Sequence, residues 1–279
     1  MNNSHPKFSV SMCVYGKDDP DWFHTALDSV VNQTLRPDQV SLVVDGPVPG
    51  EIEKIIDDYT SQYPEMLTVE FQPENLGHGI SRRRSVANCR NEIIALMDAD
   101  DISVPDRFEK TLACMAESKA DVVGGDIVEF FSKPDSIVGY RLVPKEDKEI
   151  KEYAKSRCPM NQVTVLFRKS VYELAGGYQD WYCDEDYYLW LRMIQVGATF
   201  ANTGRVEVNV RVGTDMYKRR GGMKYFRSEA KLQRYMLDLK MINLPKYLSN
   251  VVKRFVVQVV MPDSVRGWLY KLFARKAAV

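Results

Sequence analysis

The chain of 279 residues has few of the residues that bind zinc or form disulfides. Its five cysteines include no Cys-x-x-Cys pair, and its three histidines have no metal-ligand spacing to one another or to a cysteine. An odd number of cysteines without paired spacing argues against a disulfide framework, and the same spacing argues against a zinc site. We therefore expect the chain to work in a reducing cytoplasm.

Long apolar runs are also missing. The first residues show no charged segment followed by an apolar stretch, so no secretory signal is predicted. The longest late apolar run, Phe255 to Met261, is much shorter than the roughly 20 residues that span a bilayer. The hydrophobic content of 45% is still high enough for a large core, which argues against disorder.

The charge is unevenly distributed, although the formal net charge is zero. Residues 205–279 carry 17 Lys and Arg against 5 Asp and Glu, a local net charge of +12, so residues 1–204 carry −12. The two parts of the chain therefore face different surroundings.

Short β-branched runs alternate with amphipathic stretches along the first half of the chain. Strands are predicted at 8–14, 40–44, 67–71, 92–97 and 120–124, and helices at 21–33, 51–63, 80–90 and 105–118. Strands joined by helices of about 10 to 15 residues are typical of a mostly parallel α/β sheet.

The pattern is less regular after Gly125. Further strands are expected at 127–131, 162–168 and 206–212, and helices at 146–155 and 186–196. From Tyr225 onward the chain is expected to be helical, with breaks at Pro245 and Pro262.

One apolar run, 93–97, is followed at once by Asp98, Asp100 and Asp101. Carboxylates this close repel one another unless water solvates them or a hard cation such as Mg²⁺ or Mn²⁺ neutralises them. The alternative is an acidic turn that only leads into the next helix, with Asp101 as a helix-entry cap.

Two other predicted strands also end in polar or glycine-containing segments, Asp45 and 75–79. The carboxyl ends of parallel strands lie at one edge of a sheet, where such sheets bind ligands. A carboxylate, a glycine turn and a cation-binding acidic segment at this edge suit a nucleotide whose diphosphate is carried on a divalent ion.

Taken together, these segments resemble the family 2 glycosyltransferases, nucleotide-sugar enzymes of the GT-A fold. The resemblance covers about residues 8–200 and depends on SVSMCVYG, ALDSVVNQT, SLVVDGP, NLGHGI, IIALMDADDISVPDRFEK and CDEDYYLWLRM. It implies an α/β, GT-A-type nucleotide-binding fold with a mostly parallel central sheet flanked by helices. The catalytic domain would span residues 1–210, and 211–279 would form a basic loop and an amphipathic helical C-terminal region.

The resemblance also implies a binding site for the donor nucleotide. Asp45 matches the family's aspartate that recognises the nucleobase, and the backbone around Val14 and Tyr15 lines the nucleotide site. Arg82 follows the glycine turn and is a candidate contact to the phosphate or the base.

A second group of residues is implied for the diphosphate. Asp98 matches the acidic residue near the ribose, and Asp100 matches the ligand of the divalent cation, Mn²⁺ or Mg²⁺. Arg219 and Arg220 lie beside two glycines and are candidates for stabilising the leaving nucleotide; a solvated or lipid-facing charge run is the alternative.

The catalytic base is expected at Asp186, because Glu185-Asp186 resembles the family's Glu-Asp motif. A carboxylate that takes the proton of an attacking sugar hydroxyl contributes about 10²- to 10⁴-fold; without the resemblance, acidic residues at a helix start only compensate the helix dipole. With Asp184 beside them, at least one pKa of the three should be raised. Glu185, Trp181 and Trp190 are candidates near the acceptor, with core packing the alternative for Trp190.

Apolar residues in 247–259 recur at spacings of three and four among lysines and arginines, and 265–276 repeats the mixture. Basic amphipathic helices of this kind often lie in a membrane interface, and the alternative is that they pack on the catalytic domain. We expect contact with the inner face of the cytoplasmic membrane, because the lipid-linked acceptor implied by the resemblance would require it. No nucleic-acid partner is expected.

The resemblance implies an inverting, divalent-metal-dependent glycosyltransferase. It would move a sugar from a nucleotide sugar, expected to be a UDP-sugar, to a glycan or lipid-linked acceptor in bacterial capsule or amylovoran-type exopolysaccharide assembly. One alternative is a nucleotidyltransferase, but residues 15–20 are acidic and hold one glycine instead of a glycine-rich basic loop. The other is a non-catalytic membrane scaffold, which the intact Asp98, Asp100 and Asp186 disfavour.

Overall fold

The structure, a computed structural model, describes residues 5–213 and 221–262. Its strands are β1 (Phe8–Tyr15), β2 (Gln39–Asp45), β3 (Leu67–Phe71), β4 (Ile93–Leu96), β5 (Ile102–Ser103), β6 (Val122–Phe130), β7 (Ile137–Arg141), β8 (Leu166–Arg168) and β9 (Phe200–Arg211).

The helices of the described residues begin with α1 (Pro20–Val31), α2 (Gly50–Gln62), α3 (His78–Asn88), α4 (Arg107–Ser118) and α5 (Asp147–Tyr153). They continue with η1 (Gln162–Thr164), α6 (Lys169–Leu174), α7 (Glu185–Gln195), α9 (Gly222–Asp238), α10 (Leu244–Phe255) and η2 (Val256–Val260).

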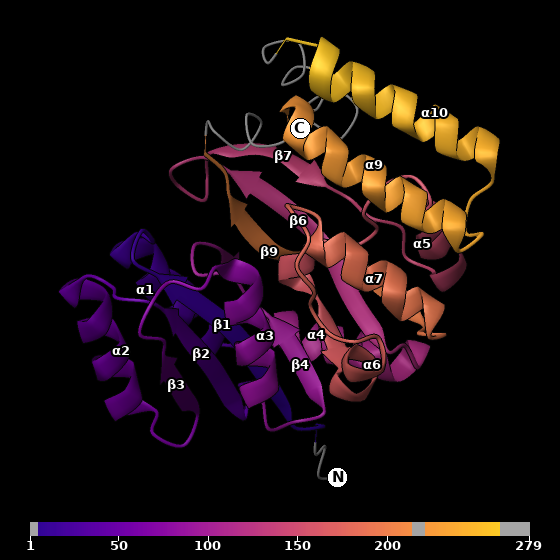
Figure 1. Ribbon diagram of the computed structural model, residues 1–279. Coiled ribbons are helices and arrows are strands. Elements are labelled where there is room, and N and C mark those ends of the chain that lie inside the picture. The colour runs from indigo at the N-terminus through magenta and orange to yellow at the C-terminus, as the bar shows by residue number, and fades with distance from the viewer. Residues whose placement is uncertain (1–4, 214–220, 263–279) are drawn as a thin grey trace.

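The strands form one sheet in the order β3-β2-β1-β4-β8-β6-β9-β5, with β7 paired to β6 (Figure 1). The first four strands of this order are parallel neighbours, as are β6 and β9. The short strand β8 runs antiparallel between β4 and β6 and joins the two parallel groups. The carboxyl ends of β1, β2 and β4 therefore lie along the same edge of the sheet.

Each face of the sheet has its own apolar core. Val10 and Met12 of β1 pack with apolar residues of α1, α2 and α4 on one face. On the other face, Ile94 and Leu96 of β4 pack with residues of α3 and α7. Successive strand residues point to opposite faces, so one strand contributes to both cores. This double burial explains why β4 appears in the sequence as a short, strongly apolar run.

The helices after β9 pack on the rest of the molecule through α9. Leu232 and Met236 of α9 are buried against Tyr187 and Leu191 of α7. In Figure 1, α10 lies on the outer side of α9, away from the sheet. The stretch 247–259, for which packing was the alternative, lies in α10 and η2, where Arg254 pairs with Glu229 of α9 and donates to the backbone oxygen of Ser156. The predicted stretch 265–276 lies outside the described residues.

The expected elements of the first half are present, with shifts of a few residues at their ends. The strands expected at 120–124 and 127–131 are one continuous strand, β6, because Gly124 and Gly125 do not break it. Residues 162–164 form a 3-10 helix instead of a strand. The short elements β5, β7 and α6 were not expected from the sequence.

Candidate active site

A cavity of about 490 Å³ opens at the carboxyl ends of β1, β2 and β4. The six residues that the sequence assigned to the donor nucleotide and the cation all line it, namely Val14, Tyr15, Asp45, Arg82, Asp98 and Asp100. The sheet topology therefore brings together residues from four separate segments of the chain, as the strand-end argument predicts. Their individual roles stay predictions.

Asp45 ends β2 and supports the glycine turn that follows β3. Its two carboxylate oxygens accept the backbone N–H groups of Leu76 (2.7 Å) and Gly77 (3.1 Å). Gly46 follows with φ +81°, and a Cβ there would lie 2.6 Å from the backbone nitrogen of Asn75. Asp45 and Gly46 together thus hold the turn close to the end of β2.

Arg82 and Asp98 form an ion pair inside the cavity. The Arg82 Nη2 lies 2.6 Å from the Asp98 Oδ1, and Arg82 is only 7% exposed. Burial would raise the pKa of Asp98, but the positive charge of Arg82, followed by His78, holds this pKa below its ordinary value. Burial lowers the pKa of Arg82, yet Asp98 more than compensates and the net pKa is raised. The pair is therefore charged at neutral pH.

Asp101 does not cap a helix, so the cap interpretation is wrong. Asp101 precedes the short strand β5, and α4 starts only at Arg107. The Asp101 Oδ1 accepts the backbone N–H of Arg211 at 2.8 Å. Burial, followed by the charges of Asp100 and Asp98, raises the pKa of Asp101 well above its ordinary value.

Within the described ranges, no three His, Cys, Asp or Glu side chains gather into a metal-binding group. Mg²⁺ bound through one or two carboxylates and substrate phosphates does not need such a group. Asp100 lines the cavity as an oxygen donor, and Asp98 is already paired with Arg82. The residues present thus fit a hard divalent cation that takes its other ligands from a bound diphosphate.

The structure adds Asp18 to the cavity, which the sequence did not identify as a site residue. Its Oδ2 accepts the backbone N–H of Tyr15 at 3.0 Å. Burial raises the pKa of Asp18 to about 7, the Tyr15 hydrogen bond opposes this rise, and the charges of Asp100 and Asp98 add to it. The sequence signal for Asp18 was its position just after β1, a strand that ends at the cavity.

His78, also in the cavity wall, is neutral at pH 7. The positive charge of Arg82, followed by burial, lowers the pKa of His78 to about 4. The ring next to the donor cavity is therefore a polar neutral group and not a cation.

The proposed base, Asp186, lies in the first turn of α7 and does not line this cavity. Its Oδ1 accepts the backbone N–H of Tyr187 at 2.6 Å, and the Cys158 thiol lies 3.8 Å from its Oδ2. Glu185 connects this turn to the cavity, since its Oε1 lies 3.9 Å from the Arg82 Nη1.

The acidic cluster raises pKa values as expected. Burial, followed by the charges of Glu229 and Asp186, raises the pKa of Asp184 to about 8. Burial and then Asp186 also raise the pKa of Glu185. Asp184 therefore keeps a proton next to the proposed base at neutral pH.

The two tryptophans differ in their surroundings. Trp190 is fully buried among residues of the α3 and α7 side of the sheet, so the idea that it stacks on a sugar is wrong and the core alternative is confirmed. Trp181 packs against Tyr188, with ring centroids 4.2 Å apart, and the Lys231 Nζ lies 4.1 Å from its ring centroid. Trp181 thus connects the start of α7 to α9.

Arg219 and Arg220 lie outside the described residues. Among the helices of the described residues, none is long and apolar enough to cross a membrane.

A crevice at the ends of parallel strands, lined by carboxylates and a buried arginine, lies where α/β proteins with open sheets bind their ligands. A family model described as glycosyl transferase family 2 matches residues 9–174. The chain belongs to this family and is a glycosyltransferase.

Three curated relatives extend the similarity to almost the full chain. A Haemophilus influenzae protein named an uncharacterized glycosyltransferase is 35% identical over 97% of this chain and 100% of its own. An Escherichia coli UDP-Gal:alpha-D-GlcNAc-diphosphoundecaprenol beta-1,3-galactosyltransferase is 32% identical over 99% of both chains. The amylovoran biosynthesis glycosyltransferase AmsE of Erwinia amylovora is 34% identical over 95% of this chain and 98% of its own.

The fold is also similar to a solved structure. The S. aureus TarS 1–349 structure in complex with UDP-GlcNAc matches with a TM-score of 0.66 and 15% identity, over 95% of this chain and 79% of that one. The expected α/β fold of the GT-A type, with its helical C-terminal part, is confirmed.

Proposed function

We propose that the chain is an inverting, divalent-cation-dependent glycosyltransferase that transfers a sugar from a UDP-sugar to a lipid-linked glycan in bacterial polysaccharide assembly. The observation that carries this proposal is the cavity in which Asp45, Arg82, Asp98 and Asp100 meet at the strand ends. The names of two relatives, a galactosyltransferase that uses UDP-Gal and an amylovoran enzyme, support the substrate classes.

The nucleoside would bind between the end of β1 and the turn held by Asp45. Val14 and Tyr15 line one side of the cavity, and Asp45 keeps the Leu76–Gly77 backbone in place on the other. Asp98 is held by Arg82 and would accept a hydrogen bond from the ribose. Because these groups are already hydrogen-bonded or ion-paired, little reorganisation is needed on binding.

Asp100 would bind the divalent cation, Mg²⁺ or Mn²⁺, together with the donor diphosphate. When bound, the cation would supply positive charge that stabilises the departing nucleoside diphosphate. Arg219 and Arg220 would add to the stabilisation of the leaving group.

Asp186 would take the proton of the acceptor hydroxyl. Its Oδ1 accepts the Tyr187 N–H, so the carboxylate is fixed at the start of α7. As the acceptor hydroxyl loses its proton, its oxygen forms the new bond to the anomeric carbon. The bond from this carbon to the diphosphate oxygen breaks on the opposite face. The configuration at this carbon is inverted, and no covalent enzyme intermediate forms.

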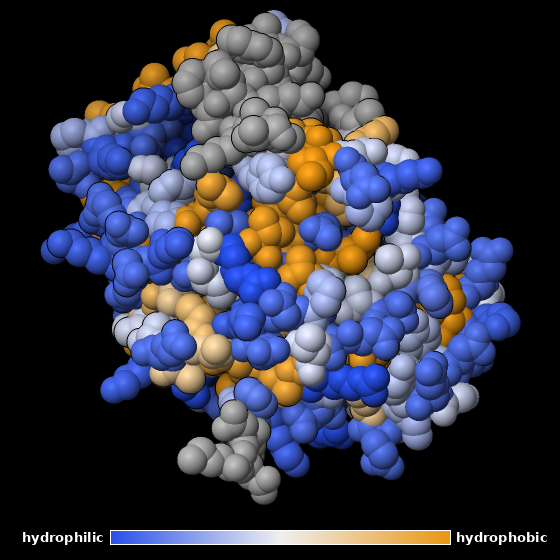
Figure 2. Space-filling view, turned by 180° about the vertical axis from the view of Figure 1, so that it is seen from behind, coloured by the Kyte–Doolittle hydropathy of each residue, from blue (hydrophilic) through white to orange (hydrophobic). Residues whose placement is uncertain are grey.

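We place the enzyme at the inner face of the cytoplasmic membrane, where a lipid-linked acceptor is available. Exposed apolar residues of the C-terminal helices support this, namely Leu244, Leu248, Val252, Phe255, Val256 and Val260. Figure 2 shows apolar side chains along the upper margin of the molecule, on the side where α10 lies.

The first experiment measures the products formed from a panel of UDP-sugars with Mn²⁺ and a synthetic lipid-diphosphate GlcNAc acceptor. We expect release of UDP and a glycosylated lipid, with inverted anomeric configuration by NMR. In Asp186→Asn, the transfer rate should fall about 10²- to 10⁴-fold while UDP binds as in the wild type.

The exposed Asp180 provides a matched control, since Asp180→Asn removes a carboxylate a few residues before α7 without touching the cavity. Full transfer by Asp186→Asn would refute the assignment of the base. Release of pyrophosphate instead of UDP would indicate a nucleotidyltransferase, and failure to bind any nucleotide would favour a non-catalytic scaffold.

A further inference from the structure

Arg211, the last residue of β9, makes contacts with three other segments of the chain. Its backbone N–H donates to the Asp101 Oδ1 at 2.8 Å, and its Nε donates to the backbone oxygen of Asp100 at 3.1 Å. Its Nη1 donates to the backbone oxygen of Ser132 at 2.9 Å. One side chain thus joins the acidic segment of the donor site to the turn after β6.

Two aromatic rings lie against the same guanidinium. The Arg211 Cζ is 4.5 Å from the ring centroid of Trp22 in α1 and 4.7 Å from that of Phe130 in β6. Arginine suits this position because its planar head packs against the rings while its N–H groups donate in the plane. A lysine has the same charge but cannot reproduce both sets of contacts.

These contacts act on the backbone of the acidic segment. The peptide oxygen of Asp100 and the side chain of Asp101 are both bound to Arg211, and the adjacent strand β5 pairs only with β9 among the described strands. Asp100 lines the donor cavity, so its direction depends on how this backbone is held.

We propose that Arg211 is a positioning residue of the donor site, which holds the Asp100–Asp101 backbone so that the Asp100 carboxylate faces the cavity. This inference deepens the proposed function and rests on it for the nature of the ligand. Arg211 acts through the backbone of its neighbours and is not assigned a contact with substrate.

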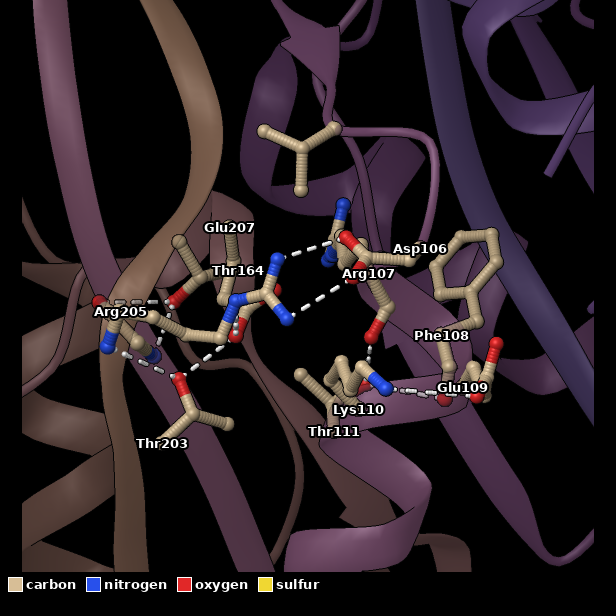
Figure 3. Close-up of polar contacts among 12 residues, drawn as sticks. Asp106, Arg107, Phe108, Glu109, Lys110, Thr111, Thr164, Thr203, Arg205 and Glu207 are labelled. Carbon is tan, nitrogen blue, oxygen red and sulfur yellow. Dashed lines mark hydrogen bonds and ion pairs between the residues drawn. The ribbon is translucent and has the colours of Figure 1, made fainter. Parts of the chain in front are cut away.

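Arg205 lies on the same strand and offers a matched control. Figure 3 shows its guanidinium facing Asp106 at the start of α4, where its two Nη atoms lie 2.6 and 2.9 Å from the carboxylate oxygens. Arg205 does not line the donor cavity. Arg205→Lys therefore removes a bidentate contact from β9 without loosening the acidic segment.

The test compares the wild type, Arg211→Lys, Arg211→Met and Arg205→Lys. UDP binding with Mn²⁺ is measured by calorimetry, and amide hydrogen exchange is measured over residues 98–104. We expect both Arg211 variants to bind UDP about ten-fold more weakly, since they lose charge-assisted hydrogen bonds and aromatic packing. Exchange over 98–104 should accelerate in both, and Arg205→Lys should resemble the wild type in both measurements.

A surface variant covers the case in which the Arg211 variants do not fold. Trp22 is 41% exposed, so the Trp22→Ala variant should fold. It should bind UDP about three-fold more weakly, and amide exchange over residues 98–104 should accelerate. Trp22→Phe should bind UDP like the wild type. The proposal would be overturned if Arg211→Lys kept the UDP affinity and the amide exchange of the wild type. It would also be overturned if amide exchange over residues 98–104 accelerated as much in Arg205→Lys as in Arg211→Lys. A wild type that binds no UDP would instead refute the proposed function, while the exchange data would still test the backbone support.

Discussion

Two fully buried charged residues, Arg107 and Glu207, lie behind the acidic segment of the donor site. The Arg107 Nη2 donates to the backbone oxygen of Leu96 at 2.7 Å, at the end of β4. Glu207 accepts a hydrogen bond from the Thr203 hydroxyl at 2.6 Å, a contact visible in Figure 3. Burial lowers the pKa of Arg107 to about 10 and raises that of Glu207 to about 7.

The pKa of Glu207 makes stability depend on pH. Between pH 4.5 and 7 the folded protein keeps a proton on Glu207 that the unfolded chain releases, so this group's contribution to stability falls as pH rises through 7. In Glu207→Gln this dependence is lost. Relative to the variant, the wild type should lose about 2 kcal/mol of unfolding free energy between pH 5 and pH 8, as measured by urea unfolding.

The exposed Glu117 on α4 is the control, and Glu117→Gln should follow the pH dependence of the wild type. Parallel curves for the wild type and Glu207→Gln would show that the buried carboxylate keeps an ordinary pKa.

At the residue scale, the sequence predicted the groups that lie at strand ends. Asp45, Asp98 and Asp100 could be found because each follows an apolar run directly, and a parallel sheet brings such ends together. Arg211 could not be found in this way. The partners of Arg211 are distant in sequence, so its role depends on the tertiary fold and not on a local pattern.

At the element scale, prediction succeeded where burial imposes a clear period. The parallel strands β1, β2 and β4 are buried on both faces, and α1 carries one apolar stripe, so both kinds of element are visible in the sequence. The two-residue strand β5 and the edge strand β7 have no such pattern. Their positions are set by pairing with β9 and β6, which the sequence alone does not reveal.

Gly125 lets β6 continue where the sequence suggested a break. A Cβ at this position would lie 2.4 Å from the Glu207 Cγ and 2.8 Å from the Thr203 Oγ1. Gly125→Ala should therefore lower the unfolding free energy by about 1–3 kcal/mol in denaturant titrations.

Gly79 is the matched glycine, because it lies in α3 and a Cβ there meets no atom within 4 Å. Gly79→Ala should raise the unfolding free energy by about 0.5–1 kcal/mol, because alanine lowers the conformational entropy of the unfolded chain. If Gly125→Ala were equally well tolerated, close approach would not be the reason for glycine in β6.

At the scale of the whole molecule, the C-terminal helices combine packing with an exposed apolar ridge. Arg254 of α10 pairs with Glu229 of α9 and donates from its Nη2 to the backbone oxygen of Ser156 at 2.7 Å. Leu248 and Val252 lie four residues apart on the outer side of α10 and are 52% and 59% exposed. The inner side of α10 thus fixes the helix on the rest of the molecule, and its outer side exposes apolar side chains.

We expect the protein to sediment with vesicles that contain phosphatidylglycerol, and more weakly at high salt because lysines flank the ridge. The double variant Leu248→Glu/Val252→Glu should bind these vesicles at least about ten-fold more weakly, since two apolar side chains no longer enter the interface.

Leu174 of α6 is 68% exposed and lies on another element, so Leu174→Glu should bind vesicles like the wild type. Equal vesicle binding by the double variant would remove α10 as the membrane-facing element.

Arg82 contacts Asp98, which follows β4, and Glu185, which begins the helix of the proposed base. A single guanidinium therefore borders both the cavity and the turn that holds the proposed base. Loss of this one side chain would leave two carboxylates, one from each of these places, without the cation that they share.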